Sequence, residues 1–249
     1  AQTGSIEKAR KILARIGGQP YATQTLLEMS TVASSDQKKT DFQALLEPKM
    51  IKILFLGVTL AVLQQWCGIN VIFNYAEEVF SAAGYQVSDI LFNILVTGAV
   101  NLVFTFVALF AVDRFGRRVL MLTGAGGLAV IYTVLGVVYH YKSHGIHMLL
   151  LVVAAIACYA MSLAPVTWVV ISEIFPNRVR GTAMSVAITA LWIACFILTY
   201  SFPILNKVLG AAGTFGIYAV ICLAGFLYMK GHLPETKGKS LEEIERSWE

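Results

Sequence analysis

The sequence predicts an all-α fold, a bundle of six transmembrane helices with short cytoplasmic helices at its N-terminus. Of the 249 residues, 57% are hydrophobic and 14% are charged, whereas soluble domains carry about 25% charged residues. The mean hydropathy is +0.70. The apolar residues fall into six runs near the ~20 residues that cross the hydrocarbon core of a bilayer. A chain of this composition has too few charged residues to form a surface that water solvates, so we place it among integral membrane proteins.

Residues 1–49 differ in character from the rest. Ser5 can cap a helix that runs to Ile16 with apolar residues on one side, and Gly17 and Gly18 end that helix. A second short helix is predicted over 22–32, followed by the polar linker SSDQKKTD. We therefore expect 1–49 to form a cytoplasmic helical region and its linker.

The spans follow in order, and a polar tail ends the chain. Short connections between the apolar runs favour antiparallel neighbours. The predicted spans cover 50–76, 88–112, 118–140, 147–174, 182–206 and 214–230, so the transmembrane bundle occupies 50–230 and the cytoplasmic tail 231–249.

Lysine and arginine are concentrated on one side of the predicted bundle. They precede the first span, occupy the loops after the second and fourth spans and follow the sixth, while the opposite loops hold only Lys142 and Lys207. The positive-inside rule then places both termini in the cytoplasm. We expect a multi-pass protein of the cell (inner or plasma) membrane.

Neither a metal site nor a cofactor site is predicted. TGAGGLAV (123–130) resembles a dinucleotide-binding loop only weakly, because no strand precedes it. No nucleophile–base pair stands out, so we predict no enzyme, no cofactor and no nucleic-acid partner. The four cysteines lie inside apolar runs and are expected to be buried thiols: Cys67, Cys158, Cys195 and Cys222. Three histidines are expected to lie in or beside a solvated loop and not to bind a metal: His140, His144 and His147.

Five short motifs stand at informative places along the chain. Any one of them could arise by chance, but each falls in its own span or loop. They are QQWCGIN (64–70) in the first span, DRFGRR (113–118) after the second, APVTW (164–168) in the fourth, SEIFPNRVRG (172–181) after it, and PETKG (234–238) after the sixth.

These motifs closely resemble the sugar porter family of the major facilitator superfamily, which includes bacterial xylose–proton symporters and glucose facilitators. The resemblance covers the whole chain. It implies that 50–230 is the C-terminal six-helix half of a twelve-span transporter, and that 1–49 is the end of the family's cytoplasmic helical domain. The partners it implies are the lipid bilayer, the missing N-terminal six-helix half, and a monosaccharide substrate, either a hexose or a pentose.

The carboxamides Gln64, Gln65 and Asn70 are the candidate substrate site. A carboxamide offers both a donor and an acceptor, the complement of the vicinal hydroxyls of a sugar. Polar side chains inside a span normally face a protein interior or a water-filled cavity. The alternative is hydrogen bonding between helices, worth about 1 kcal/mol per pair. By resemblance, these three residues and Asn101 hydrogen-bond substrate hydroxyls.

Trp168 and Trp192 are the candidate aromatic partners of the sugar. Both lie well inside their spans, whereas membrane tryptophans usually gather at the interfaces. A flat ring with a free N–H group suits the C–H face of a pyranose. Packing within the bundle is the alternative for Trp192.

Two helix breaks and an outer gate complete the predicted site. Gly68 permits unwinding inside the first span, and Pro165 removes a helix hydrogen bond inside the fourth. By resemblance, Asn74 and Tyr75 form the outer gate. Three positions depart from the residues usual in sugar-binding members and leave the particular sugar open: Asn74, Ala164 and Leu191.

A charge network is predicted at the cytoplasmic face. The loop after the second span and the end of the fourth span bring acidic and basic residues to the same membrane edge. We expect a salt-bridge network that holds the bundle ends together while the cytoplasmic side is closed and breaks when it opens. Its predicted members are Asp113, Arg114, Arg117, Arg118, Glu173 and Arg180.

The predicted function is carriage of a monosaccharide across the membrane by alternating access, with proton coupling left open. The alternatives are another solute transporter of the superfamily and a sugar sensor that does not transport. We expect that this half-chain transports nothing alone, because its site needs the opposite half to close it.

Overall fold

A computed structural model describes the protein over residues 6–36, 44–82, 84–142, 145–176, 179–239 and Glu243. Within these ranges every regular element is a helix, so the predicted all-α class is confirmed for the part of the chain that the structure describes. The chain divides into two compact units, Ala1–Ala44 and Leu45–Glu249, each of which is described by itself.

Over its described residues the first unit contains α1 (Ile6–Asp36), which is interrupted at Gly18. Gly18 has φ 83° and ψ 174°, a backbone conformation that glycine adopts without steric cost. The interruption lies between the two predicted short helices. The predicted linker overlaps the end of α1, and its remaining residues lie outside the described ranges.

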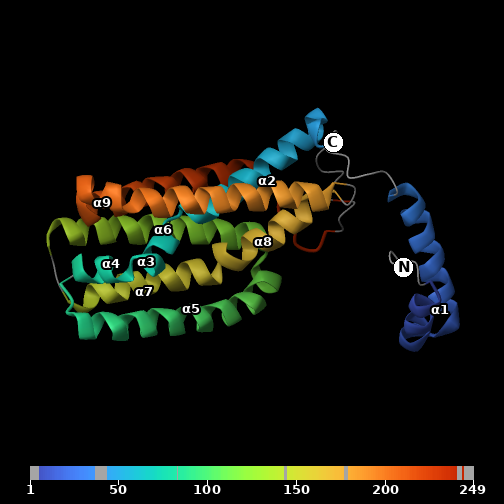
Figure 1. Ribbon diagram of the computed structural model, residues 1–249, viewed down its shortest axis with the longest axis horizontal. Helices are drawn as coiled ribbons and strands as arrows, with labels where there is room; N and C mark the ends of the chain where they lie inside the picture. Colours follow the sequence, from blue (N-terminus) through green and yellow to red (C-terminus); the bar gives the residue numbers. More distant parts are fainter. Residues whose placement is uncertain are drawn as a thin grey trace. The chain divides into compact units, whose positions relative to one another are not determined.

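The second unit is a helical bundle (Figure 1). A short 3-10 helix, η1 (Ala44–Leu46), precedes it. The helices of the bundle are α2 (Pro48–Trp66), α3 (Ile69–Asn74), α4 (Ala76–Ala82), α5 (Val87–Phe115), α6 (Arg117–His140), α7 (Ile146–Met161), α8 (Leu163–Ile174) and α9 (Arg180–His232).

Five segments of the described chain are long and apolar enough to cross a membrane: Pro48–Asn74, Asp89–Phe115, Arg117–His140, Ile146–Ile174 and Arg180–His232. The last of them, α9, has 53 residues, which at 1.5 Å per residue is far longer than the ~30 Å hydrocarbon core. Gly210 interrupts it with φ 67° and ψ 176°. Figure 1 shows α9 as two arms that run beside each other in opposite directions, an orange first arm and a redder second arm.

The break between α2 and α3 is built on Gly68. Its φ of 85° places it in the left-handed region, where a side chain would be strained. A Cβ atom at this position would also lie 2.7 Å from the Tyr218 ring of the second α9 arm. The thiol of Cys222 donates to the Cys67 carbonyl at 3.7 Å, so the second arm also satisfies a backbone group that the break exposes.

A second break separates α7 from α8, and it falls before Pro165. Ser162 takes φ −127° and ψ −91° between the two helices, and Pro165 then lies in the first turn of α8. A proline ring clashes with the carbonyl of the residue four positions earlier, which here is Met161, the last residue of α7. The non-helical residue, Ser162, therefore lies on the N-terminal side of the proline that causes the break.

We expect Gly68→Ala to destabilise the bundle by roughly 2–4 kcal/mol, because it adds left-handed strain to a clash with a buried ring. The measurement is the thermal unfolding midpoint of the purified protein in detergent. Gly98→Ala is the matched control, since a Cβ there meets nothing within 4 Å and alanine favours the helix. Equal midpoints for the two variants would contradict the role given to Gly68.

Candidate functional site

The three carboxamides of the QQWCGIN motif form one hydrogen-bonded chain across the α2–α3 break. The Asn70 amide donates to Gln65 Oε1, and the Gln65 amide donates to Gln64 Oε1 at 3.0 Å. Gln64 and Gln65 are buried, whereas Asn70 is half-buried. Because Gly68 turns the backbone, a residue of α3 can reach back to the last turn of α2. The structure therefore brings these three predicted site residues together.

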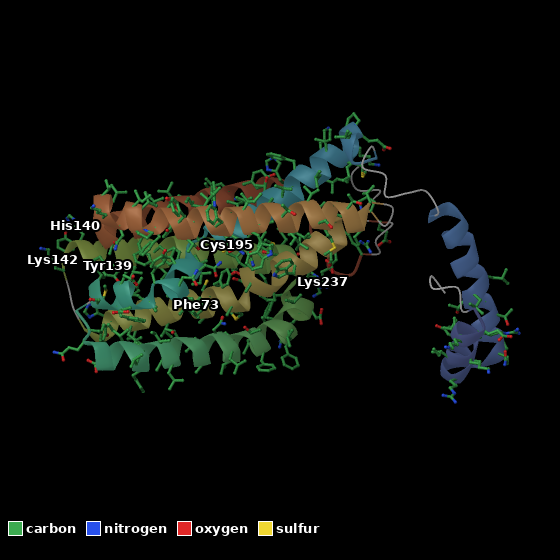
Figure 2. All side chains as sticks on the ribbon, in the orientation of Figure 1. Phe73, Tyr139, His140, Lys142, Cys195 and Lys237 are labelled. Atoms are coloured by element: carbon green, nitrogen blue, oxygen red, sulfur yellow. The ribbon has the colours of Figure 1, made fainter. Side chains whose placement is uncertain are left out.

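The first arm of α9 packs against this amide chain. Asn70 Nδ2 lies 3.9 Å from Cys195 Sγ, and the Trp66 indole N–H donates to the Ala194 carbonyl at 3.2 Å. Figure 2 labels Cys195 near the middle of the bundle's length, between the end with His140 and the end with Lys237. The amide chain is therefore at mid-depth of the bundle.

The other predicted sugar-contacting residues are not hydrogen-bonded to this amide chain. Asn101 is half-buried on α5 and its side chain makes no hydrogen bond within the described residues. Trp168 on α8 is 39% exposed and Trp192 on α9 is 63% exposed. Leu191 is buried in the core, so it faces away from the exposed side on which Trp192 lies. Both tryptophan side chains are therefore accessible for contact with another molecule or another part of the protein.

The predicted outer-gate residues lie at the end of α3, and only Tyr75 is anchored. The Tyr75 hydroxyl donates to the Thr199 carbonyl at 3.0 Å, and its ring lies 4.7 Å from the Phe202 ring. Thr199 is four residues before Pro203, which has no N–H to donate to that carbonyl. Tyr75 thus satisfies a backbone acceptor that would otherwise be unpaired in an apolar environment, while Asn74 is exposed.

The predicted charge network is centred on one ion pair. Arg117 Nη2 lies 3.1 Å from Glu173 Oε1, and both side chains are mostly buried. Asp113 is 3.7 Å from Arg117 but its side chain is 82% exposed, so this second pair is weak in high dielectric. The Arg117–Glu173 pair joins the start of α6 to the end of α8.

The other predicted arginines have backbone or aromatic contacts. Arg118 Nη2 donates to the Lys230 carbonyl at 2.8 Å, and Arg180 Nε donates to the Phe175 carbonyl at 3.1 Å. Arg114 lies over the Phe115 ring at 5.8 Å. Three buried guanidinium nitrogens, Arg117 Nε, Arg118 Nε and Arg180 Nη2, have no partner in the described structure.

The chain after α9 supplies members of the network that the sequence analysis did not assign. The Glu235 carboxylate accepts from the backbone N–H groups of Arg117 at 3.0 Å and Arg118 at 3.2 Å. Thr236 donates to Glu173 Oε2 at 2.6 Å. Lys237 donates to the Arg114 carbonyl at 2.7 Å. The signal was present as the PETKG motif, but sequence spacing does not reveal which helix ends it reaches.

Glu235 has a clear electrostatic role at the start of α6. The first backbone N–H groups of a helix have no partner inside the helix, and the helix dipole favours a negative charge beside them. A Cβ atom at Gly116 would lie 2.8 Å from Glu235 Oε2. Gly116, with φ 90°, thus provides both the turn between α5 and α6 and the space for the carboxylate.

A bundle of apolar membrane helices, broken at mid-depth beside polar side chains, is the architecture of membrane transporters. Residues 1–248 match the family described as sugar (and other) transporter. The chain belongs to this family, the sugar porters of the major facilitator superfamily, and is not an enzyme.

The similar proteins agree with this assignment. The D-xylose-proton symporter of Escherichia coli K12 is 37% identical over 252 residues, which cover 99% of this chain and 51% of the relative. The glucose facilitated diffusion protein of Zymomonas mobilis is 36% identical, covering 98% of this chain and 53% of the relative. The chain therefore spans about half the length of the curated relatives that it matches.

Solved structures give the same result for the fold. The proton:xylose symporter XylE bound to 6-bromo-6-deoxy-D-glucose matches with a TM-score of 0.81 at 36% identity, over 99% of this chain and 53% of that one. The inward open conformation of the xylose transporter XylE from E. coli matches with a TM-score of 0.74 at 35% identity, over 98% and 50%. The predicted superfamily fold is thereby supported over nearly the whole chain.

We expect Glu235→Ala to destabilise the protein by about 1–2 kcal/mol, because two N–H groups at the start of α6 lose their acceptor. The thermal unfolding midpoint in detergent measures this loss. Lys239→Ala is the control, since Lys239 is exposed in the same segment. A midpoint for Glu235→Ala that matches the control would show that the carboxylate does not cap α6.

Proposed function

We propose that this chain forms one half of a monosaccharide carrier that works by alternating access. The observation that supports the proposal best is the hydrogen-bonded chain of Asn70, Gln65 and Gln64 at a mid-bundle helix break. Three neutral amides at this depth are costly in an apolar bundle unless a polar ligand or partner uses them. A neutral polyhydroxylated solute meets that requirement.

The amide chain has open ends that suit hydroxyl groups. Within it, Gln65 both donates and accepts, so Gln64 keeps its NH₂ group and Asn70 keeps its carbonyl oxygen for other partners. One sugar hydroxyl can accept from the first, and another hydroxyl can donate to the second. Such a site rejects analogues that lack a hydroxyl, because its own amides are then left unpaired.

The second half of the carrier would complete the site. Trp168 and Trp192 present exposed rings, and the small cavity that Gln64 lines has a volume of about 10 Å³, the least that admits one water molecule. A monosaccharide needs more walls than these. We propose that an opposing six-helix half supplies them and that Asn101 and both tryptophans contact the sugar from this half, with Asn74 and Tyr75 as the outer gate.

The membrane topology that we propose has six spans. The two arms of α9 on either side of Gly210 are the fifth and sixth spans, and each arm matches a predicted apolar run. The excess of lysine and arginine then places the charge network and both termini in the cytoplasm. In this arrangement 1–49 belongs to a cytoplasmic helical region and 231–249 is a cytoplasmic tail, in a protein of the cell membrane.

We propose that the Arg117–Glu173 pair stabilises the state that is closed on the cytoplasmic side. The pair joins two helix ends and is mostly buried, so its rupture has a free-energy cost that a bound substrate must offset.

In the full-length transporter we expect Gln65→Ala to raise the half-saturating sugar concentration roughly ten- to hundredfold, because it removes the central amide of the chain. Uptake of labelled hexoses and pentoses into vesicles, with and without a proton gradient, measures this and tests coupling. The relatives include both proton symporters and a facilitated diffusion protein, which is why both conditions are needed.

Gln86→Ala is the matched control for this experiment, since Gln86 precedes α5 and is exposed. It should leave uptake unchanged. Failure of the full-length protein to move any sugar, together with no effect of Gln65→Ala, would defeat the proposed function.

We expect Glu173→Gln to shift the full-length transporter toward its inward-open state about three- to tenfold, because the charge-assisted bond to Arg117 is lost. The rate at which a membrane-impermeant maleimide labels Ser185→Cys from the cytoplasmic side measures the shift. Asp113→Asn should shift the rate much less, since Asp113 is exposed. Equal rates for Glu173→Gln and the parent would refute the gate.

A further inference from the structure

An apolar groove lies between α6 and the second arm of α9, and no predicted sugar-site residue lines it. Its volume is about 1000 Å³. The described residues that line it include Gly126, Val130 and Gly136 from α6, and Ala212, Gly216 and Val220 from α9.

The groove has a floor of small residues and rims of larger ones. Gly136 is buried, and a Cβ atom there would lie 3.1 Å from the Ala212 carbonyl oxygen, so the two helices approach closely behind the groove. Val130 and Val220 on the rims are 65% and 67% exposed. The groove is therefore open at the surface of this half of the bundle.

The length and position of the groove match one leaflet of a bilayer. From Gly126 to His140, where it ends, α6 rises about 21 Å, which is the ~15 Å half-thickness of the hydrocarbon core plus part of the headgroup region. One end is bordered by Gly126 and Phe226, within the helices. Figure 2 shows the other end, with His140 and Lys142, at the opposite end of the bundle from Lys237.

The headgroup end of the groove is polar and basic. His140 and Tyr141 line it, and the next residue, Lys142, is exposed with a φ of 49° at the end of the helix. Among the described lining residues none is acidic. An ammonium group and two ring systems at the membrane interface are suited to a phosphate group of a lipid.

We propose that this groove is a binding site for one phospholipid molecule of the leaflet opposite the Glu173 network. An acyl chain lies along the small-residue floor, and the phosphate lies beside His140 and Lys142. The groove has the length of one leaflet, and a basic group stands at its headgroup end. A phospholipid uses both features, whereas a helix of a second copy brings no phosphate group to Lys142.

The test is native mass spectrometry of the purified full-length protein, delipidated in detergent and then titrated with dioleoylphosphatidylglycerol. We expect one retained lipid per protein. Gly216→Leu should weaken this binding about tenfold, because the added side chain displaces part of the acyl chain from the groove. Loss of burial for two of its methylene groups is enough for that effect. A Cβ at Gly216 meets nothing within 4 Å, so the substitution fills the groove without a clash inside the protein.

Two matched variants complete the experiment. Gly231→Leu, near the end of the same helix and also free of contacts within 4 Å, should leave lipid retention unchanged. Lys142→Gln should reduce the preference for phosphatidylglycerol over dioleoylglycerol, which has the same chains but no phosphate, whereas Lys207→Gln should not. Should Gly216→Leu fail to fold, Thr133→Phe fills the groove from the opposite wall, where Thr133 is exposed.

Equal lipid retention by the parent and by a folded groove-filling variant would overturn the proposal. Conversion of a dimer into a monomer by Gly216→Leu, without any change in lipid, would also overturn it and assign the groove to a second copy of the chain. The readout does not involve sugar, so it is independent of the proposed transport function.

Discussion

The left-handed conformation of Gly68 is the constraint on which the candidate site depends. Because the backbone turns there, α3 begins as a new helix, and Asn70 can reach Gln65 across the break. The Tyr218 ring occupies the space where a side chain would be. The break is therefore fixed by the second arm of α9, so a residue far along the chain determines the geometry of the amide chain.

At Gly68 and at Pro203, a side chain from another element bonds to a freed backbone carbonyl. Cys222 donates to the Cys67 carbonyl beside Gly68, and Tyr75 donates to the Thr199 carbonyl that Pro203 leaves open. In an apolar environment an unpaired carbonyl has a large free-energy cost. These two side chains therefore stabilise irregular backbone inside the bundle and join segments that are distant in sequence.

The sequence was sufficient for the parts of the structure that depend on local pattern. Apolar runs predicted the helices, and Gly68 and Pro165 marked the neighbourhood of the two breaks, although Pro165 acts at Ser162 because its ring clashes one turn earlier. The roles of Cys195 and Glu235 depend on contacts between distant segments. No periodicity shows that a glutamate after the last helix caps α6, so these roles required the structure.

The contacts of α6 indicate which parts of the bundle can change shape. At one end Arg118 bonds to the Lys230 carbonyl of α9, and toward the other end Gly136 packs closely against the Ala212 backbone. The pair formed by α6 and the second α9 arm is thus joined along its length, and the described part of each is continuous. The breaks lie instead at Gly68 and Ser162, in segments beside the amide chain and Trp168. Conformational change is therefore expected at these breaks, while the pair that forms the lipid-facing groove acts as a rigid support.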